Sequence, residues 1–497
     1  MHSSIPSSST NRAHSIFKRY KPGRIVVIGG GITGLSSAHR LQELGLKNDI
    51  NPEVILLEGS GKLGGVISSK SAGGLLIEEG PDSFVASKPW ALDLCRRIGL
   101  EQDIIGSDDE ARRVFVVIGK RLVPVPDGFL LAPTRLMPFV ASPLFTWRGK
   151  LRMSLDTLLP RRNSVEDESV ADFITRRLGR EALNRFVQPM LGGIYGGKPE
   201  TLSTLATMPH LVQMEEKYRS LILGMRKQRI SEGSGKNTNG KPEHSRFISL
   251  KNGMRTLTEE LASKLNLVSI HLNTAVTGIT RINNGWKIKT EHNEIIDCDG
   301  VIIATPACTA GGMVEELDPV LARELSGIKY SSPVVINLIY NREAIAHPLD
   351  GHGFVVPESE GLPIMACSFS SVKFGGRAPR EKVILRCFIS DAADQDIGGT
   401  DDSTIAEDAH NSLNEILGIR SRPVFEQIRR YERSMPQYEV GHLERISRIN
   451  TGLSKYPGLM VAGNAYEGMG IPDCVRSGEK AAGELFDFIR RGKGAAS

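Results

Sequence analysis

The sequence predicts an α/β fold in which a discontinuous nucleotide-binding domain carries an inserted α+β substrate domain and a helical lobe. Two observations lead to this prediction. A β-turn-α-β unit with a glycine-rich turn lies near the N-terminus, and further short apolar runs, typical of buried strands, recur in the middle and near the end of the 497-residue chain. A chain of this length exceeds one simple core, so two or more lobes are expected.

The first predicted strand is Arg24–Ile28, and a second over Val54–Leu57 ends at Glu58. Between them a helix with apolar residues at helical spacing is expected to end at Gly45. The turn before this helix consists of Gly29, Gly30, Gly31, Ile32, Thr33 and Gly34. Glycines at this spacing permit a tight turn, a close approach to a pyrophosphate and close helix–strand packing, and the Glu58 carboxylate is placed to accept hydrogen bonds from ribose hydroxyls. The unit therefore predicts a bound dinucleotide, either NAD or FAD.

Later segments extend the same domain. Predicted strands over Val268–Leu272, Trp286–Thr290, Asp299–Pro306 and Leu459–Ala462 precede an amphipathic C-terminal helix. We therefore assign residues 23–89, 245–306 and 445–497 to the nucleotide-binding domain. Residues 90–223 are rich in helix formers and predict a mainly helical lobe, residues 224–244 an exposed loop, and residues 307–444 a substrate-binding domain. The Ser-rich residues 1–22 have no apolar core and predict a disordered leader.

Composition limits the classes of partner. The formal charge of +5 is too diffuse to predict nucleic-acid binding, although it leaves open peripheral contact with an acidic membrane surface. The six cysteines form no Cys-x-x-Cys pair and no His cluster accompanies them, so no metal site is expected. No stretch approaches the roughly 20 apolar residues of a membrane span. We expect a cytoplasmic protein with reduced thiols.

The block after Glu58 separates FAD from NAD. Gly61 to Gly65 (GKLGG) resembles the second fingerprint of the FAD-dependent amine-oxidase superfamily, with Lys62 in place of the usual arginine. Glu79 to Phe84 (EGPDSF) resembles the flavin-side loop of porphyrinogen oxidases, and Gly463 to Cys474 (GNAYEGMGIPDC) resembles their flavin-closing segment. Residues 188–197, 219–225 and 435–438 resemble further blocks in the same order. The chain is thus similar to the FAD-dependent coproporphyrinogen III and protoporphyrinogen oxidase family, and most of all to its soluble Gram-positive type.

The resemblance implies a Rossmann-like FAD-binding domain whose terminal helix directs its N-terminus at the flavin. Val276 matches the family position whose backbone contacts adenine, or it is a plain core valine. The cofactor-binding residues implied by motif and resemblance together are Gly29, Gly30, Gly31, Ile32, Thr33, Gly34, Glu58, Lys62, Gly64, Gly65, Val66, Gly80, Pro81, Asp82, Ser83, Val276, Gly463, Gly470, Ile471 and Asp473.

The family's activity implies removal of hydrides from a porphyrinogen by flavin N5, with dioxygen as the final acceptor, in haem biosynthesis. No general base stands out in the sequence. Lys88 is either a contact for a substrate propionate or a solvated surface lysine. Val123 stands where plant-type protoporphyrinogen oxidases carry a propionate-binding arginine, which favours coproporphyrinogen III, a substrate with four propionates, over protoporphyrinogen IX with two. A more basic site and handover of the product to other haem-pathway enzymes are expected accordingly.

Other functions remain open from the sequence. They are protoporphyrinogen oxidation, a flavin amine oxidase or carotenoid desaturase, and an FAD-binding scaffold without catalysis. The paired glycines Gly64 and Gly65 and the C-terminal segment disfavour a plain NAD-dependent dehydrogenase.

Overall fold

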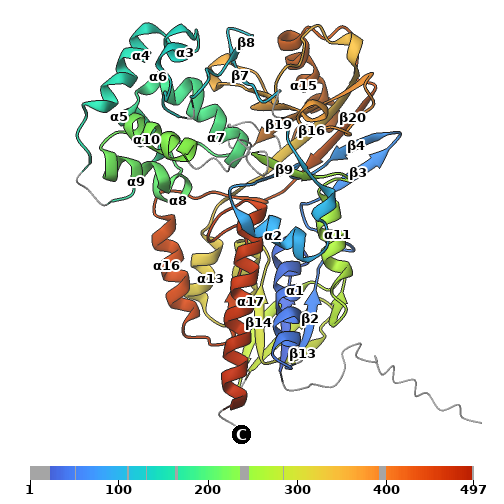
Figure 1. Cartoon of the computed structure of the whole chain (residues 1–497). Coiled ribbons are helices and arrows are strands. Elements are labelled where there is room, and N and C mark those ends of the chain that lie inside the picture. The colour runs from blue at the N-terminus through green and yellow to red at the C-terminus, as the bar shows by residue number, and fades with distance from the viewer. Residues whose placement is uncertain are drawn as a thin grey trace, which may run out of the picture.

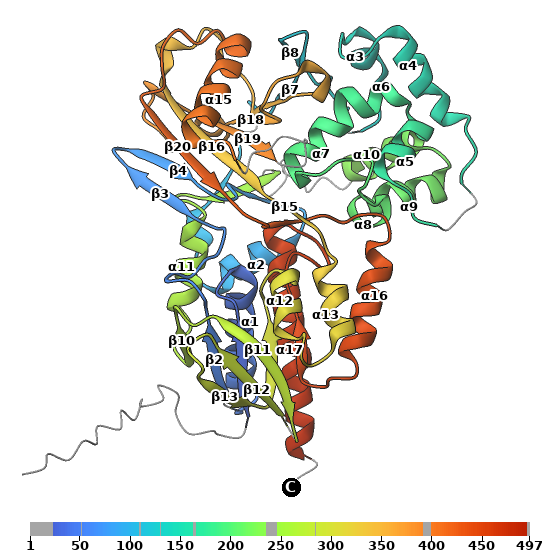
Figure 2. The same ribbon diagram turned by 180° about the vertical axis from the view of Figure 1, so that it is seen from behind.

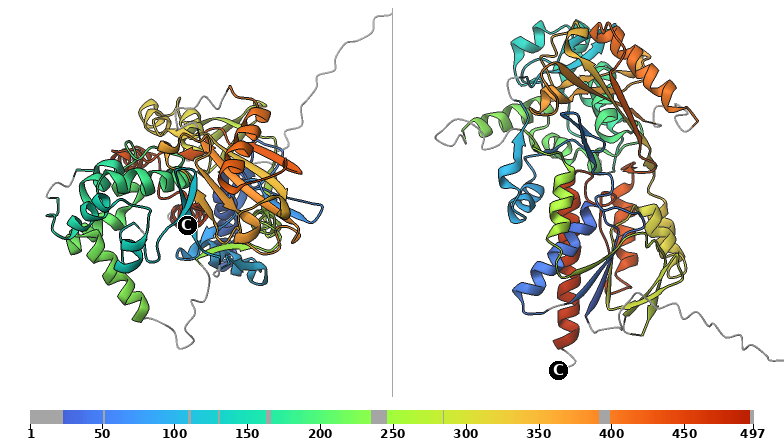
Figure 3. Two further views of the ribbon diagram at one scale, coloured as in Figure 1. Left: turned by 90° about the horizontal axis from the view of Figure 1, so that it is seen from above. Right: turned by 90° about the vertical axis from the view of Figure 1, so that its right-hand side faces the viewer.

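The computed structural model of the chain describes residues 23–494, apart from residues 51, 109–110, 130, 163–165, 235–245, 284 and 391–398. The molecule has two tiers. A parallel-sheet domain forms the lower tier, and a helical lobe and a larger second sheet form the upper tier (Figure 1). The views from above and from the side show the two upper parts next to each other over the lower domain (Figure 3). The expected leader, residues 1–22, lies outside the described residues.

The lower domain is built on a five-stranded parallel sheet with the strand order β10-β2-β1-β14-β22. The inner strands are apolar and buried on both faces, as in parallel sheets covered on both sides. The predicted α/β fold is confirmed. The strands come from distant parts of the chain, namely β1 (Arg24–Ile28), β2 (Glu53–Leu57), β10 (Val268–His271), β14 (Gly300–Ile303) and β22 (Leu459–Val461).

Alternate residues of β1 divide the core of this domain between the two faces of the sheet. Ile25 and Val27 pack against α1 (Ile32–Lys47), α2 (Pro89–Arg97), α11 (Arg255–Ser263) and α17 (Ile471–Gly494). Val26 and Ile28 pack toward the other face, which is covered by a small antiparallel sheet and three helices (Figure 2). These elements are β11 (Val276–Ile282), β12 (Gly285–Thr290), β13 (Ile295–Cys298), α12 (Ala307–Met313), α13 (Pro319–Ser326) and α16 (His442–Leu453).

This packing corrects three sequence-based boundaries. Helix α2 falls in the range expected for the helical lobe, but its fully buried Leu94 and Cys95 pack in the same core as α1 and α17. Helices α12 and α13 fall in the range expected for the substrate domain, but they cover the parallel sheet. Helix α1 continues past Gly45 to Lys47 because the cap backbone N–H of Asn48 still finds acceptors in the last turn.

The upper sheet has seven strands in the order β20-β16-β19-β18-β17-β7-β8. Helix α15 (Asp402–Leu417) packs on one face, and the helical lobe borders the other through Val116, Val355 and Ala366. The strands are β7 (Val114–Ile118), β8 (Arg121–Pro124), β16 (Pro333–Asn341), β17 (Gly353–Val355), β18 (Ala366–Phe369), β19 (Lys382–Ser390) and β20 (Phe425–Arg430).

Residues 114–124 were expected to lie in the mainly helical lobe, but they form β7 and β8 of the upper sheet. The two strands form a hairpin in which Ile118 pairs with Arg121. Its two-residue turn has Gly119 at φ 56° and Lys120 at φ 63°, and positive φ at both positions is typical of the tight hairpin turn that matches strand twist. The run of β-branched residues before the turn is therefore a strand.

The helical lobe spans most of residues 136–234. Its helix α10 continues through the first part of the expected exposed loop, residues 224–244, which is a correction; the part of that loop from residue 235 onward lies outside the described residues. The lobe contains α3 (Leu136–Ala141), α4 (Trp147–Ser154), α5 (Val170–Arg177), α6 (Arg180–Ala182), α7 (Gln188–Tyr195), α8 (Thr204–Thr207), α9 (Pro209–Tyr218) and α10 (Leu221–Ser234), with short turns η2 (Leu155–Thr157) and η3 (Leu183–Val187).

The remaining elements are short. They are β3 (Ser69–Ala72) with β4 (Leu75–Glu78), β5 (Phe84–Val85) and β6 (Ile104–Gly106) on either side of β9 (Phe247–Leu250), β15 (Tyr330–Ser331) with β21 (Met435–Pro436), α14 (Ser370–Lys373) and the turns η1 (Glu101–Asp103), η4 (Arg342–Ala344) and η5 (Glu358–Glu360).

A fully buried ion pair holds the helical lobe together. The Arg177 Nε donates to Asp156 Oδ1 at 2.7 Å, and both side chains are completely buried. The second Asp156 oxygen accepts from the Ser220 hydroxyl at 2.6 Å and from the Ile222 backbone N–H at 3.0 Å. One carboxylate therefore joins η2, α5 and the start of α10.

Asp156→Ala should destabilise the protein by about 3–5 kcal/mol, because the buried Arg177 guanidinium loses its nearer counter-ion and keeps only Glu215, at 3.5 Å. Denaturant unfolding followed by circular dichroism measures this change. Glu407→Ala is the matched control: it removes one partner of the exposed Glu407–Arg422 pair and should leave the midpoint almost unchanged. Equal shifts for the two variants would contradict the role given to Asp156.

Candidate functional site

The glycine-rich turn lies between β1 and α1 at the carboxyl edge of the parallel sheet. Gly29 has φ 108°, a conformation that favours glycine. A Cβ at Gly34 would lie 1.8 Å from the Gly29 carbonyl oxygen, so this position requires glycine for close helix–strand packing. A Cβ at Gly31 would meet nothing within 4 Å. Gly31 therefore faces open space at the N-terminus of α1, where backbone N–H groups bind anions.

The second glycine block forms the neighbouring wall. The Gly64 N–H donates to the Gly30 carbonyl at 2.9 Å, and Gly64 and Gly65 have φ 105° and 59°. Glu58 ties the first turn from below, because its Oε2 accepts the Gly30 N–H at 2.6 Å and its Oε1 accepts the Ser60 N–H at 2.7 Å. The two fingerprints thus form one rigid unit.

The flavin-side loop comes close to this unit. A Cβ at Gly80 would lie 1.7 Å from the Val66 carbonyl oxygen, so only glycine fits there. The C-terminal segment completes the third wall: the Gly463 N–H donates to Ser477 Oγ at 3.0 Å, and the Tyr438 hydroxyl donates to the Asn464 carbonyl at 2.6 Å and accepts the Gly468 N–H at 2.9 Å. Tyr438, in the MPQY block, thereby fixes the closing segment.

Three cavities run into one another between these walls. The phosphate cavity, of about 340 Å³, is bordered by Gly31, Thr33, Gly64, Thr305 and Gly463. It shares Ile32, Val66, Ile67, Tyr431, Ser434, Asn464 and Cys474 with an inner cavity of about 290 Å³. The inner cavity shares Gly192, Gly196 and Met365 with an outer recess of about 550 Å³.

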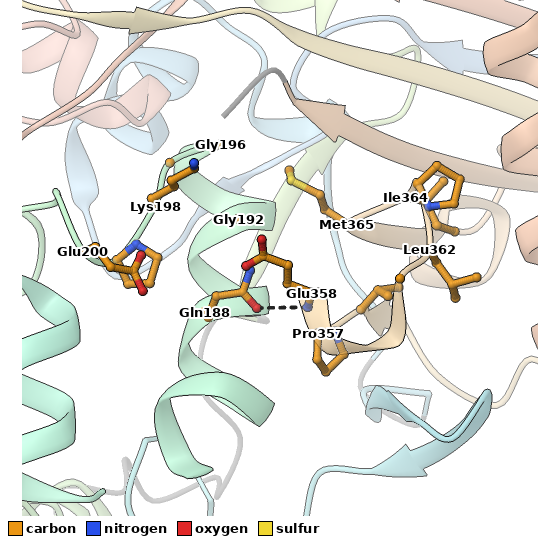
Figure 4. Close-up of a pocket in the computed structure, with 15 residues that line it drawn as sticks. Gln188, Gly192, Gly196, Lys198, Glu200, Pro357, Glu358, Leu362, Ile364 and Met365 are labelled. Atoms are coloured by element: carbon orange, nitrogen blue, oxygen red, sulfur yellow. Dashed lines mark hydrogen bonds between the residues drawn. The ribbon is translucent and has the colours of Figure 1, made fainter. Parts of the chain in front are cut away.

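The outer recess lies between the helical lobe and the upper sheet. In Figure 4, Gln188 and Gly192 on α7 and Gly196 at its C-cap face Pro357, Glu358, Leu362 and Met365 across it. Lys198 and Glu200 lie beyond the end of α7. The Gln188 side-chain oxygen accepts the Glu358 backbone N–H at 3.3 Å and connects the two sides. The recess is therefore a passage from the surface of the upper tier toward the inner cavity.

The residues present fit a flavin dinucleotide. The open space at Gly31 and the N-terminus of α1 suit the pyrophosphate. The inner cavity offers flat contact at Gly80 and Gly470 and apolar contact at Ile67, Pro81 and Ile471, as a planar ring system requires. The α17 N-terminus begins at Ile471 and adds a favourable dipole for negative charge.

Three carboxylates under the flavin-side loop are each matched by a cation. The distances are 3.5 Å from Arg377 to Glu78, 2.8 Å from Arg429 to Glu79 and 3.1 Å from Lys373 to Asp82. Burial alone would raise the pKa of Asp82, but the Lys373 ammonium and the Arg386 guanidinium hold it well below its usual range. Burial raises the pKa of Glu78 against the opposing effects of its Ser69 hydrogen bond and Arg377.

Several of the sequence-predicted residues lie elsewhere than in the cavity walls. The buried Asp473 carboxylate accepts from Lys88 Nζ at 2.6 Å, so these two predicted residues pair with each other at the start of α17. Asp82 points into the ion-pair cluster under the loop. Lys62 is exposed. Val276 is buried in the core. Its segment lies beside the end of β2, because the Thr274 N–H donates to the Glu58 carbonyl oxygen at 2.8 Å.

The upper sheet supplies residues that the sequence reasoning missed. Val335 on β16, Met365 before β18 and Arg386 and Phe388 on β19 line the inner cavity. Arg386 had a usable signal, because it is a lone charge within the apolar run Val383–Ile389. The other three look like ordinary core residues, and only the packing of the sheet against the lower domain places them at the cavity.

Comparisons with known proteins agree with this site. The model of the flavin containing amine oxidoreductase family matches residues 32–486. The coproporphyrinogen III oxidase of Bacillus subtilis (strain 168) is 33% identical over 467 residues, which cover 94% of this chain and 98% of that protein. The chloroplastic protoporphyrinogen oxidase 1 of Arabidopsis thaliana is 28% identical, with 94% and 88% covered. A crystal structure of a protein from Exiguobacterium sp. 255-15 is similar with a TM-score of 0.82 at 30% identity, with 94% of this chain and 99% of that chain covered. The predicted resemblance and the predicted FAD cofactor are confirmed.

Gly31→Ala should fold normally but bind FAD roughly tenfold or more weakly, the effect of about 1.4 kcal/mol of lost binding free energy. Gly31 has φ −73° and ψ 179°, which alanine adopts freely, and its methyl group would enter the open space meant for phosphate. The measurements are FAD titration of the apoprotein and its thermal unfolding.

Gly34→Ala is the contrasting variant, because its methyl group would collide with the Gly29 carbonyl and should lower the stability of the apoprotein itself. Normal FAD affinity in Gly31→Ala would contradict the placement of the phosphate.

Proposed function

The chain belongs to the flavin containing amine oxidoreductase family, and from this premise we propose that it is an FAD-dependent oxidase that converts coproporphyrinogen III to coproporphyrin III. The run of connected cavities, from the phosphate-binding turn to a recess at the surface, is the observation that carries the proposal. The similarity to a Bacillus subtilis protein of that name supports the choice of substrate. Dioxygen as the acceptor, with peroxide as its product, and handover of coproporphyrin to a later haem-pathway enzyme are parts of the same proposal.

Bound FAD supplies the hydride-accepting chemistry of the six-electron oxidation. The glycine-rich turn, the second glycine block and the closing segment hold the cofactor. The inner cavity holds the reacting face of the macrocycle in mainly apolar surroundings, including Val335, Met365, Phe388 and Ile389, and so excludes water. The contribution of the chain is binding, orientation and dehydration of the substrate.

Protoporphyrinogen IX is the alternative substrate, supported by the apolar character of the inner cavity and by the Arabidopsis relative. Val123 on β8 argues against it, because its side chain packs against the core of the helical lobe and offers no cation for a propionate. Lys88 remains proposed as a substrate contact only if its pair with Asp473 opens.

The purified holoprotein should oxidise coproporphyrinogen III in air faster than protoporphyrinogen IX and form peroxide with the fluorescent porphyrin. A side-by-side assay of porphyrin fluorescence and peroxide measures this preference, with an amine substrate as the control for general amine oxidation. Faster oxidation of protoporphyrinogen would instead establish the alternative, and oxidation of amines alone would refute both.

We also propose that the protein contacts a membrane peripherally through one face of the helical lobe. Trp147 and Leu151, one turn apart on α4, are 70% and 69% exposed, and Leu158, which follows η2, is 77% exposed. Other exposed residues of the same segment, residues 135–161, are apolar or basic, namely Leu136, Met137, Leu155, Arg135, Arg148 and Arg161. The one acidic residue in the described part of residues 128–162 is Asp156, which is buried. Apolar side chains bordered by cations fit an anionic lipid surface. In the described part of the chain, no helix is long and apolar enough to cross a bilayer.

The protein should sediment with vesicles that contain phosphatidylglycerol, and more salt should weaken this binding. Replacing both Trp147 and Leu151 with serine should reduce the binding about tenfold or more, because each buried apolar side chain contributes about 1.5–3 kcal/mol. Leu46→Ser, a change of an exposed leucine on α1 in the lower domain, is the control and should bind like the unchanged protein. No sedimentation of the unchanged protein with these vesicles would refute the proposal.

A further inference from the structure

The inner cavity contains a single source of charge. Among the described residues that line it, Arg386 is the one ionised side chain, and its neighbours on the upper sheet are Val335, Met365, Phe388 and Ile389. Arg386 itself is 3% exposed. A cation in such apolar surroundings is costly unless an anion accompanies it.

The nearest carboxylate, Asp82, supplies only part of that negative charge, because it is shared with a closer cation. Glu78, Glu79 and Asp82 are each matched by another cation, as described above. Asp82 is the carboxylate that faces Arg386, at 3.7 Å, but both of its oxygens are also held by Lys373 at 3.1 and 3.2 Å and one by Ser83 at 2.7 Å. In this group of described residues, Arg386 is the fourth cation beside three carboxylates.

The guanidinium also retains hydrogen-bonding capacity. Its Nη2 donates to the Gly80 carbonyl oxygen, and its central carbon lies 4.8 Å from the centre of the Phe388 ring. Its Nε is buried and has no hydrogen-bond partner. A guanidinium has five N–H donors in a fixed planar arrangement that matches a carboxylate. Both the charge and the unpaired donor therefore call for an anion that enters the cavity.

We propose that Arg386 binds a propionate carboxylate of the porphyrinogen at the inner end of the cavity and thereby selects coproporphyrinogen III over protoporphyrinogen IX. This inference rests on the proposed function. Coproporphyrinogen carries a propionate on each of its four pyrrole rings, whereas protoporphyrinogen has uncharged vinyl groups on two of them. A macrocycle that enters from the outer recess with two propionates toward the surface presents those two differing rings to the inner end.

The placement of Arg386 favours the substrate over the cofactor as its partner. Arg386 is on β19 of the upper sheet, beside Phe388 and near Met365, which also borders the outer recess. Its one contact with the flavin-side loop is to the Gly80 carbonyl oxygen, whereas the phosphate-binding turn and the α17 N-terminus belong to the lower domain. A binding site with a buried charged group rejects a substrate analogue that lacks the complementary group, because the buried charge of the protein is then left unpaired.

The test compares the unchanged holoenzyme with Arg386→Met and Arg386→Lys, each at equal FAD content, on both porphyrinogens. Arg386→Met should lower kcat/KM for coproporphyrinogen about 30-fold or more, mainly through KM, and change that for protoporphyrinogen by less than about threefold. Arg386→Lys, which keeps the charge but loses the planar fork, should lie between the two. Lys382→Met removes a cation from the first residue of β19 and should leave the ratio unchanged.

Two further measurements separate the outcomes. The reduction potential of bound FAD should be nearly the same in all variants; a changed potential with an unchanged substrate ratio would mean that Arg386 serves the cofactor and would overturn the inference. If Arg386→Met does not fold, Arg386→Lys replaces it, and its affinities for coproporphyrin and protoporphyrin are measured by quenching of porphyrin fluorescence. An affinity for coproporphyrin alone that is lower than that of the unchanged enzyme supports the inference. Affinities for both porphyrins equal to those of the unchanged enzyme overturn it. If the unchanged enzyme oxidises neither porphyrinogen, the proposed function fails instead.

Discussion

The close approach of backbone segments at the carboxyl edge of the parallel sheet is the constraint on which the rest of the structure depends. Gly34 touches the Gly29 carbonyl, Gly64 donates to Gly30, and Gly80 lies against the Val66 carbonyl. A side chain at Gly34 or Gly80 would collide with these carbonyl oxygens, and the φ of 105° at Gly64 favours glycine. Together they set the distance between the turn, the second glycine block and the flavin-side loop, and so the width of the space that receives the cofactor.

The upper tier adds what the lower domain lacks. The parallel sheet and its loops provide three walls of the cavities, and the upper sheet and α7 provide the fourth. The ion pairs under the flavin-side loop attach the two tiers, because Glu78, Glu79 and Asp82 come from the lower domain's loop region while Arg377, Arg429 and Lys373 come from the upper sheet and its connections. The position of the cofactor site relative to the substrate site is therefore fixed by ion pairs as well as by packing.

Much of this arrangement could be predicted from the sequence, because its signals are local. The strand that begins at Arg24, the glycine-rich turn and the following helix were predicted from spacing, although the helix runs past the predicted end at Gly45 to Lys47. The resemblance of the EGPDSF and GNAYEGMGIPDC blocks indicated FAD. The hairpin β7–β8 could not be assigned to the upper sheet, because its partner β17 lies more than two hundred residues later in the chain. Likewise, Lys88 and Asp473 are far apart in sequence, and no local pattern indicates that they pair. Contacts of this kind depend on tertiary packing.

The central claim is that the porphyrinogen passes its electrons directly to the flavin within the cavities of this protein. It is tested most directly by mixing the FAD-loaded protein with coproporphyrinogen III in the absence of dioxygen and following the visible absorbance of the flavin. The account predicts rapid loss of that absorbance, and its return when air is admitted. A flavin spectrum that stays unchanged under these conditions, while the protein still forms coproporphyrin in air, would contradict the account.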